Sequence, residues 1–263
     1  MRARLGLWGR SDASASENGP ASGPAAGKEP EAVASAPAEQ PLLEAAGVTR
    51  SFGVGGARLD VLRGVDIALM PGRLVMLRGR SGSGKTTLLN LLGGLDVPTG
   101  GEIRFLGEPL HRLGDAERTR IRRKRIGFIF QAYALMPMLS AYENIELSLR
   151  LAGVPRAEWK RRTAQCLELV GLGKRASHRP FELSGGEQQR VCIAKAIAHK
   201  PLLLLADEPT AELDSNMTRR MIDVFRAIIA DEGATVCMTT HDATIVEEAD
   251  HVYEMADGAL ATG

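Results

Sequence analysis

The chain has 263 residues, of which 44% are hydrophobic, and its formal net charge is +1. This length allows one large domain or two small ones, and the near-balance of charge gives no reason to expect a polyanion such as nucleic acid as a partner. Aromatic residues make up only 4% of the chain, which argues against stacking platforms for single-stranded nucleic acid.

The cysteine pattern and the hydropathy indicate in which cellular compartment the chain works. Cys166, Cys192 and Cys237 are far apart, odd in number and without a metal-ligand spacing, so we expect reduced thiols, as in a cytosolic protein. No uninterrupted apolar run approaches the roughly 18 residues that a membrane-spanning helix needs. We therefore expect any work at a membrane to be done through a partner.

Residues 1–41 are predicted to form a disordered N-terminal tail. Most of this segment is rich in Ala, Pro, Ser, Gly and Glu and nearly lacks large apolar side chains, so burial could not offset the entropy of ordering it. The first ten residues are basic and include Leu5, Leu7 and Trp8. A frayed terminus and a weak contact with anionic lipid are both open interpretations of those ten residues.

From Leu42 onward, short apolar runs alternate with helix-like stretches. Four runs are predicted to be buried strands: Leu74–Leu77, Ile126–Phe130, Leu202–Ala206 and Thr235–Thr239. The predicted helices are Lys85–Leu92, Ala141–Ala152, Arg156–Val170, Gly185–His199 and Ser215–Asp231. This alternation predicts an α/β fold with a mostly parallel sheet and helices on both faces. Two further segments, Val48–Phe52 and Val61–Leu69, are predicted to be antiparallel strands that flank the first parallel strand.

A glycine-rich loop follows the first predicted parallel strand. It fits the pattern G-x-x-x-x-G-K-[ST] in full, and its residues are Gly79, Arg80, Ser81, Gly82, Ser83, Gly84, Lys85 and Thr86, with Thr87 next. Glycines let backbone N–H groups turn around phosphate oxygens, and the helix N-terminus adds partial positive charge. We expect Lys85 to reach the β- and γ-phosphates of ATP and the Thr86 hydroxyl to coordinate Mg²⁺. The sequence therefore predicts a P-loop NTPase.

Two carboxylates end another predicted strand, at Asp207 and Glu208. Parallel sheets bind ligands at the carboxyl ends of their strands, so Asp207 should arrive beside the phosphate loop and hold Mg²⁺ through water. Glu208 could then orient the attacking water and take its proton. The alternative is a solvated strand end followed by a turn at Pro209; the phosphate loop favours the catalytic interpretation.

A third motif, Leu-Ser-Gly-Gly-Glu-Gln-Gln-Arg, occupies residues 183–190. In this position it resembles the signature motif of ATP-binding-cassette (ABC) ATPases. Ser184, Gly185 and Gly186 precede a predicted helix, whose N-terminus can hold a phosphate. Because the first phosphate site is already complete, a second anion site suggests that it completes the nucleotide pocket of another copy. Taken alone, the motif also fits an ordinary serine-capped helix with Glu three residues on.

The resemblance covers about residues 42–261 and implies roles for four further residues. Gln131 matches the glutamine that touches Mg²⁺ and senses the permease, and His241 matches the histidine that contacts the γ-phosphate. Asp214 matches an aspartate that crosses the dimer interface, and Phe52 lies where an aromatic ring stacks on adenine. A lone His or Phe is more often a packing residue. The implied domain spans residues 42–263, with an antiparallel β subdomain and a helical subdomain at about 132–195.

Finer similarity points to the macrolide-export and lipoprotein-release subfamily of MacB/LolD type. It rests on residues 133–137, 143–147 and 151–155. This resemblance implies a homodimer at the cytoplasmic face of the cell membrane, bound to an integral-membrane permease with four helices and a large external domain (MacB/FtsX-like). Three departures stand out: Ala211-Glu212 replaces a usual Gly-Asn, Phe52 replaces a commoner Tyr, and the tail is outside the family core.

The expected function is therefore ATP hydrolysis that drives a separate permease, of the export or lipoprotein and peptide extrusion type. One alternative is a soluble ABC ATPase not coupled to transport, which would call for a long coiled-coil insertion or a second cassette. Another is a small-molecule kinase on a P-loop fold. That alternative leaves the motif at 183–190 and His241 unexplained.

Overall fold

A six-stranded sheet forms the centre of the computed structural model, which describes residues 40–211 and 213–261. Its strands lie in the order β10 (Ala259–Leu260), β9 (His251–Ala256), β3 (Leu74–Arg78), β8 (Thr235–Thr240), β7 (Leu203–Ala206) and β6 (Ile126–Ile129). Every neighbouring pair is parallel except the antiparallel pair β9–β10. The four predicted parallel strands are thus confirmed to within a residue at each end.

The central strands are buried on both faces. In β3, Leu74 and Met76 belong to one core cluster, whereas Val75 and Leu77 belong to the other. The same alternation holds in β7 and β8. Because side chains alternate across a strand, continuous apolar runs are what a sheet covered on both faces requires.

An antiparallel sheet covers one face. Its strands lie in the order β2 (Ala57–Leu69), β1 (Leu43–Val54), β4 (Gly100–Phe105) and β5 (Glu108–Pro109). The expectation that the first two flank the first parallel strand was wrong, because the neighbours of β3 are β8 and β9. Strand β2 buries alternate residues such as Val65, Ile67 and Leu69, the pattern of a sheet with one solvated face.

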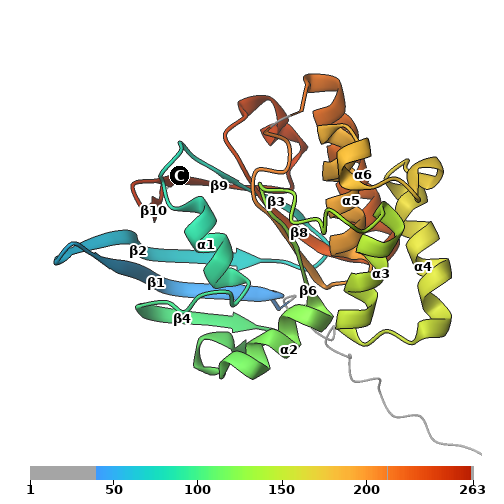
Figure 1. The fold of residues 1–263 in the computed structure, drawn as a ribbon. Coiled ribbons are helices and arrows are strands. Elements are labelled where there is room, and N and C mark those ends of the chain that lie inside the picture. Colours follow the sequence, from blue (N-terminus) through green and yellow to red (C-terminus); the bar gives the residue numbers. More distant parts are fainter. Residues whose placement is uncertain (1–39, 212, 262–263) are drawn as a thin grey trace, which may run out of the picture. The chain divides into compact units, whose positions relative to one another are not determined.

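Helix α1 (Lys85–Leu92) lies beside this antiparallel sheet (Figure 1). Its leucines share one core cluster with strands of both sheets. The opposite face of the parallel sheet packs against α3 (Ala141–Ala152), α4 (Arg156–Leu169), α5 (Gly185–Ile197) and α6 (Ser215–Glu232). All five predicted helices are confirmed, with ends shifted by at most two residues.

Several elements were not predicted. Helix α2 (Asp115–Arg125) has no buried residue, and its sequence has no apolar periodicity from which a helix could be predicted. Strand β9 buries only Met255, and β10 has just two residues. Residues 40–211 and 213–261 also contain four short 3₁₀ helices: η1 (Leu110–Arg112), η2 (Gly173–Arg175), η3 (Pro180–Glu182) and η4 (Ala243–Glu248).

The remaining expectations concern the tail, the membrane and the thiols. The predicted tail lies outside the described residues, apart from Gln40 and Pro41. Within the described residues, no helix combines the length and the apolar character needed to cross a bilayer. The three cysteines are free and buried. Burial raises the pKa of the Cys166 thiol to about 11 and that of Cys237 to about 12, so neither forms a reactive thiolate near neutral pH.

A buried arginine fastens the helices to one another. The Arg162 guanidinium on α4 donates to the backbone oxygens of Ile197 and Ala198 at the end of α5, at 2.7 and 2.8 Å. It also donates to the Glu232 carboxylate at the end of α6, at 2.7 Å. The two charged side chains are only 10% and 12% exposed, so each depends on the other to offset its desolvation.

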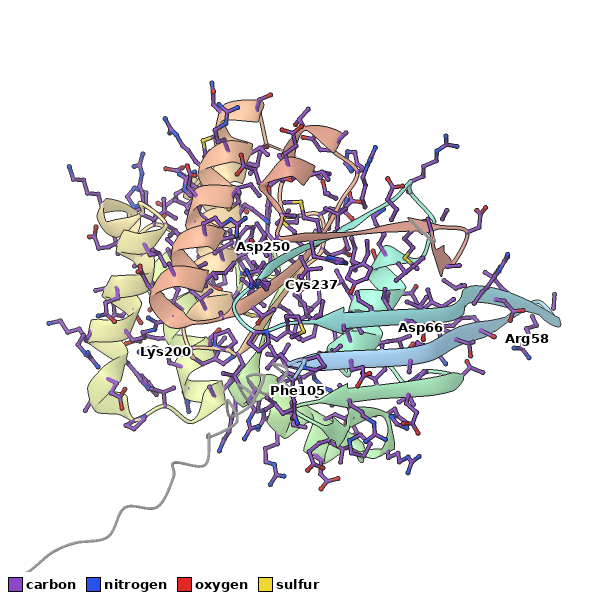
Figure 2. All side chains as sticks on the ribbon, turned by 180° about the vertical axis from the view of Figure 1, so that it is seen from behind. Arg58, Asp66, Phe105, Lys200, Cys237 and Asp250 are labelled. Carbon is purple, nitrogen blue, oxygen red and sulfur yellow. The ribbon has the colours of Figure 1, made fainter. Side chains whose placement is uncertain are left out.

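Arg162→Met should lower the free energy of unfolding by about 3 kcal/mol, because it leaves the buried Glu232 carboxylate without its ion-pair partner and two buried carbonyl oxygens without their donor. Chemical denaturation followed by circular dichroism measures this. The matched control is Arg58→Met, which breaks an ion pair whose arginine is 69% exposed and should change stability little. Equal effects of the two substitutions would contradict a special role for the buried pair. Figure 2 shows Arg58 at the far tip of the β1–β2 hairpin.

Candidate functional site

The phosphate loop joins β3 to α1 and forms a close-fitting backbone cradle. A Cβ atom at Gly79 would lie 2.3 Å from the Met255 carbonyl oxygen, so only glycine fits there. Gly82 and Gly84 have φ of 80° and 103°, in the left-handed region that glycine adopts without strain. The Ser83 hydroxyl is buried and has no hydrogen-bond partner within the described part of the chain. An open cradle with an unpartnered hydroxyl fits the phosphates of ATP.

Lys85 lies in this cradle with its side chain only 5% exposed. Its ammonium donates to the carbonyl oxygens of Gly79 and Arg80, at 2.8 and 3.0 Å. The Glu208 carboxylate lies 3.6 Å away. A buried cation with these few partners is a strong attractor for an added anion. Thr86, the next residue, is exposed, and Thr87 is half-buried.

Glu208 lies between the phosphate loop and the strand end at His241. One carboxylate oxygen is 3.6 Å from the Lys85 ammonium, and the other is 3.4 Å from His241 Nδ1. Glu208 has φ of 45°, a strained value for a residue with a Cβ. Its backbone N–H donates to the Thr239 hydroxyl at 2.8 Å. This backbone geometry aims the carboxylate at the loop.

Asp207 is oriented by the same threonine. The Thr239 hydroxyl donates to the Asp207 carboxylate at 2.8 Å, and the Asp207 N–H donates to the carbonyl oxygen of Ile129 at 2.8 Å. Thr239 thus holds two neighbouring acidic residues in different directions. Thr239 was not predicted as a site residue from the sequence, although its place two residues before His241 on the predicted strand was a usable signal.

Gln131 follows β6 and shares a small cavity with Glu208 and Gln189. The structure therefore brings Gln131, Asp207, Glu208 and His241 to the carboxyl ends of neighbouring strands. Among the described residues there is no group of three or more His, Cys, Asp or Glu side chains suited to a metal ion. The donor set at this edge, a hydroxyl, an amide and a carboxylate, fits Mg²⁺, which usually keeps several waters and phosphate ligands.

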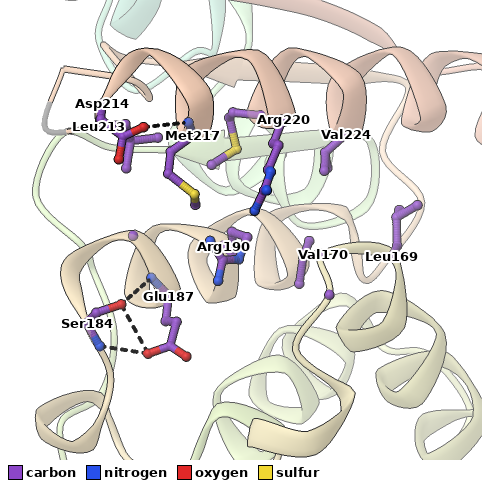
Figure 3. A pocket seen from close by; sticks show the side chains of 13 residues that line it. Leu169, Val170, Ser184, Glu187, Arg190, Leu213, Asp214, Met217, Arg220 and Val224 are labelled. Carbon is purple, nitrogen blue, oxygen red and sulfur yellow. Dashed lines mark hydrogen bonds between the residues drawn. The ribbon is translucent and has the colours of Figure 1, made fainter.

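The predicted second anion site is elsewhere on the chain. Figure 3 shows Ser184 and Asp214 on the walls of a cavity of about 650 Å³ between α5 and α6. Ser184 caps α5, since its hydroxyl accepts from the Glu187 N–H at 3.3 Å. Asp214 caps α6 by accepting from the N–H groups of Asn216 and Met217. Among the described residues, this cavity shares no lining residue with the cavity of about 590 Å³ over the phosphate loop.

Gly185 and Gly186 form the first turn of α5 after Ser184, and a Cβ at Gly185 would lie 2.9 Å from the Tyr133 hydroxyl. Phe52, on β1, is 36% exposed. The Arg50 guanidinium lies 4.4 Å above the Phe52 ring centroid and is itself held by Asp96 at 2.8 Å. Arg50, which lies against this ring, was not predicted from the sequence.

Comparison with known proteins gives one consistent result. Residues 62–211 match the ABC transporter family. An uncharacterised ABC transporter ATP-binding protein of Thermotoga maritima is 43% identical over 83% of this chain and 93% of its own length. The lipoprotein-releasing system ATP-binding protein LolD of Hyphomonas neptunium is 42% identical over 84% of this chain and 97% of its own length. The macrolide export ATP-binding/permease protein MacB of Azoarcus sp. is 44% identical, but the chain covers only 33% of it.

Solved structures agree with this assignment. The ABC transporter cassette MJ0796, solved as a dimer, has a TM-score of 0.79 and 36% identity, covering 84% of this chain and 97% of that chain. A second MJ0796 dimer, in a post-hydrolysis state bound to ADP and phosphate, has a TM-score of 0.78 at the same identity. The chain belongs to the ABC transporter family, as one of its ATP-hydrolysing cassettes.

Proposed function

We propose that this chain hydrolyses MgATP as a head-to-tail homodimer and drives a separate integral-membrane permease from the cytoplasmic face of the cell membrane. The domain that does so spans residues 42–263, with a helical subdomain at about 132–195. The observation that carries the proposal is the separation of the phosphate loop from Ser184 into two cavities of one chain. Two MJ0796 cassettes were solved as dimers, which supports the arrangement.

In the proposed site, the loop from Gly79 to Thr87 holds the phosphates of ATP and Phe52 stacks on adenine. Lys85 exchanges its carbonyl partners for phosphate oxygens, which carry full negative charge. Thr86, Gln131 and Asp207 hold Mg²⁺, which offsets charge on the phosphates. From the second copy, Ser184 and the turn at Gly185–Gly186 face the γ-phosphate with a helix N-terminus.

Glu208 is the proposed general base. Its carboxylate lies at the phosphate loop, within 3.6 Å of Lys85, so it can orient a water toward the γ-phosphate and accept its proton. His241 lies 3.4 Å from the other oxygen and can contact the phosphate. Asp214, at the N-terminus of α6, is the proposed contact across the dimer interface.

The permease is proposed to dock at an apolar groove of about 270 Å³ beside the Gln131 loop. Phe130 and Leu151 are 40% and 55% exposed there, although both are large apolar side chains. The Lys195 ammonium on α5 donates to the Ala134 carbonyl oxygen, and the Cys192 thiol donates to that of Tyr133 at 3.3 Å. A partner in this groove would therefore press on the loop that carries Gln131 and on α5 together.

Relatives named for lipoprotein release and for macrolide export support a permease of the extrusion type. The proposed permease has four helices and a large external domain, as the resemblance of residues 133–137, 143–147 and 151–155 implies. The alternative, a soluble ABC ATPase, gives no account of the exposed apolar groove. Copurification of the chain with a membrane protein encoded beside it would separate these two functions.

Glu208→Gln should bind ATP, form a stable dimer and lower hydrolysis at least about a hundredfold, because the amide cannot accept a proton from water. Asp207→Asn should instead weaken Mg²⁺-dependent ATP binding. Gel filtration with ATP and Mg²⁺, together with phosphate release, compares the two variants. Near-parental hydrolysis by Glu208→Gln would show that another group takes the proton.

Ser184→Arg should leave ATP binding intact and abolish turnover, because the arginine would fill the place of the second copy's γ-phosphate. The substitution also removes a helix cap, which typically costs about 1 kcal/mol. Ser140→Arg is the matched control, since Ser140 and Glu143 form the same capping box at α3. Without the permease, that control should keep its basal turnover. Full activity of Ser184→Arg would contradict a site shared between two copies.

Leu151→Asp should lower permease copurification and permease-stimulated hydrolysis at least about fivefold, the loss expected for a buried apolar contact, and leave basal hydrolysis unchanged. Glu143 is a poorer choice for this test, because its carboxylate accepts from the Ser140 N–H and caps α3. Leu106→Asp, at a 41% exposed leucine outside the groove, is the control. Undiminished stimulation of Leu151→Asp would remove the groove from the interface.

A further inference from the structure

Helix α2 carries four exposed cations that the proposed catalytic site does not use. They are Arg120, Arg123, Lys124 and Arg125, and together they form the α2 cation patch. None of the four makes an ion pair or a side-chain hydrogen bond with any other residue that the structure describes. The nearby carboxylate of Asp115 lies instead beside two other arginines of the helix, at 3.6 and 4.0 Å.

Local structure does not account for this density of charge. A helix C-terminus carries roughly half a negative charge, which offsets only a fraction of four cations. The patch does not serve packing either, since α2 has no buried residue. The helix is tied down by Arg122, which donates to the Gly94 carbonyl oxygen at 2.6 Å. The patch is therefore a concentrated positive surface whose cations form no ion pair within the described residues.

The patch is continuous with the apolar groove. Of the four cations, Arg123 lines that groove together with the exposed Phe130 and Leu151, so the patch meets exposed apolar side chains at this residue. Lys and Arg beside exposed apolar groups are the chemistry of contact with an anionic bilayer surface. A nucleic acid fits less well, because its phosphate backbone would pair with the cations but would give the exposed apolar side chains beside them no partner.

We infer that the α2 cation patch binds anionic lipid headgroups of the bilayer in which the permease lies. This contact goes beyond the proposed coupling and does not require the permease. Helix α2 ends at Arg125 and β6 begins at Ile126, so the lipid contact lies at the start of the strand that leads to Gln131. The lipid surface would thus orient the groove toward the membrane before the permease engages.

The test is cosedimentation of the full chain with vesicles, without nucleotide or permease. Vesicles of phosphatidylcholine mixed with phosphatidylglycerol should bind the chain, vesicles of phosphatidylcholine alone should not, and added salt should weaken binding. The triple variant Arg120→Gln, Lys124→Gln, Arg125→Gln should bind about a hundredfold more weakly, since each cation near an anionic surface contributes roughly fivefold.

The matched control is the triple variant Arg156→Gln, Lys160→Gln, Arg161→Gln, which removes the same charges from exposed positions on α4. It should bind vesicles as the parent does. Both variants should keep the parent circular dichroism spectrum and basal ATP hydrolysis. Vesicle binding and ATP hydrolysis are therefore measured independently, and failure of the lipid inference can be told from failure of the proposed catalytic function. Equal loss in both triples, or undiminished vesicle binding by the α2 triple, would overturn the inference. Loss of permease copurification with unchanged vesicle binding would assign the patch to an acidic segment of the permease instead.

Discussion

Burial of the parallel sheet on both faces is the constraint on which the rest of this structure depends. Strands β3, β7 and β8 have almost no exposed residue, so neither face can be left to solvent. Helix α1 and the antiparallel sheet cover one face, and helices α3, α4, α5 and α6 cover the other. With both faces occupied, the carboxyl edge of the sheet is the place left for chemistry. The loops after β3, β6, β7 and β8 all meet there.

At this edge, the charge of Lys85 and the strained backbone of Glu208 both help to hold the Glu208 carboxylate beside the phosphate loop. Lys85 is almost fully buried, and Glu208 and two carbonyl oxygens are near its ammonium. The left-handed backbone of Glu208 and its hydrogen bond to Thr239 hold the carboxylate there. Strain of this kind costs on the order of 1 kcal/mol or more, and it persists because the packed strands on either side determine the backbone. The result is a preorganised acidic group beside an anion cradle.

The same packing joins the nucleotide edge to the surfaces where partners are proposed to act. Ser184 caps the N-terminus of helix α5. Further along the helix, Cys192 and Lys195 hold the backbone after Gln131. Arg162 fastens the far ends of α5 and α6 to α4. Because α5 joins these contacts, a partner in the apolar groove and a phosphate at Ser184 would both contact the same helix.

The sequence by itself determined four of the five parallel strands and five of the six α-helices in the described part of the chain. It also determined where the glycine-rich, acidic and serine-glycine motifs lie along the chain, because apolar runs, caps and glycine patterns are local signals. It did not place β1 and β2 in a separate sheet, since strand pairing depends on contacts between distant segments. It missed α2, whose charged residues carry no apolar period. Thr239 as the shared support of Asp207 and Glu208, and Arg50 against Phe52, emerged only from the tertiary structure. Such contacts join residues far apart in sequence, and only packing decides which polar groups meet.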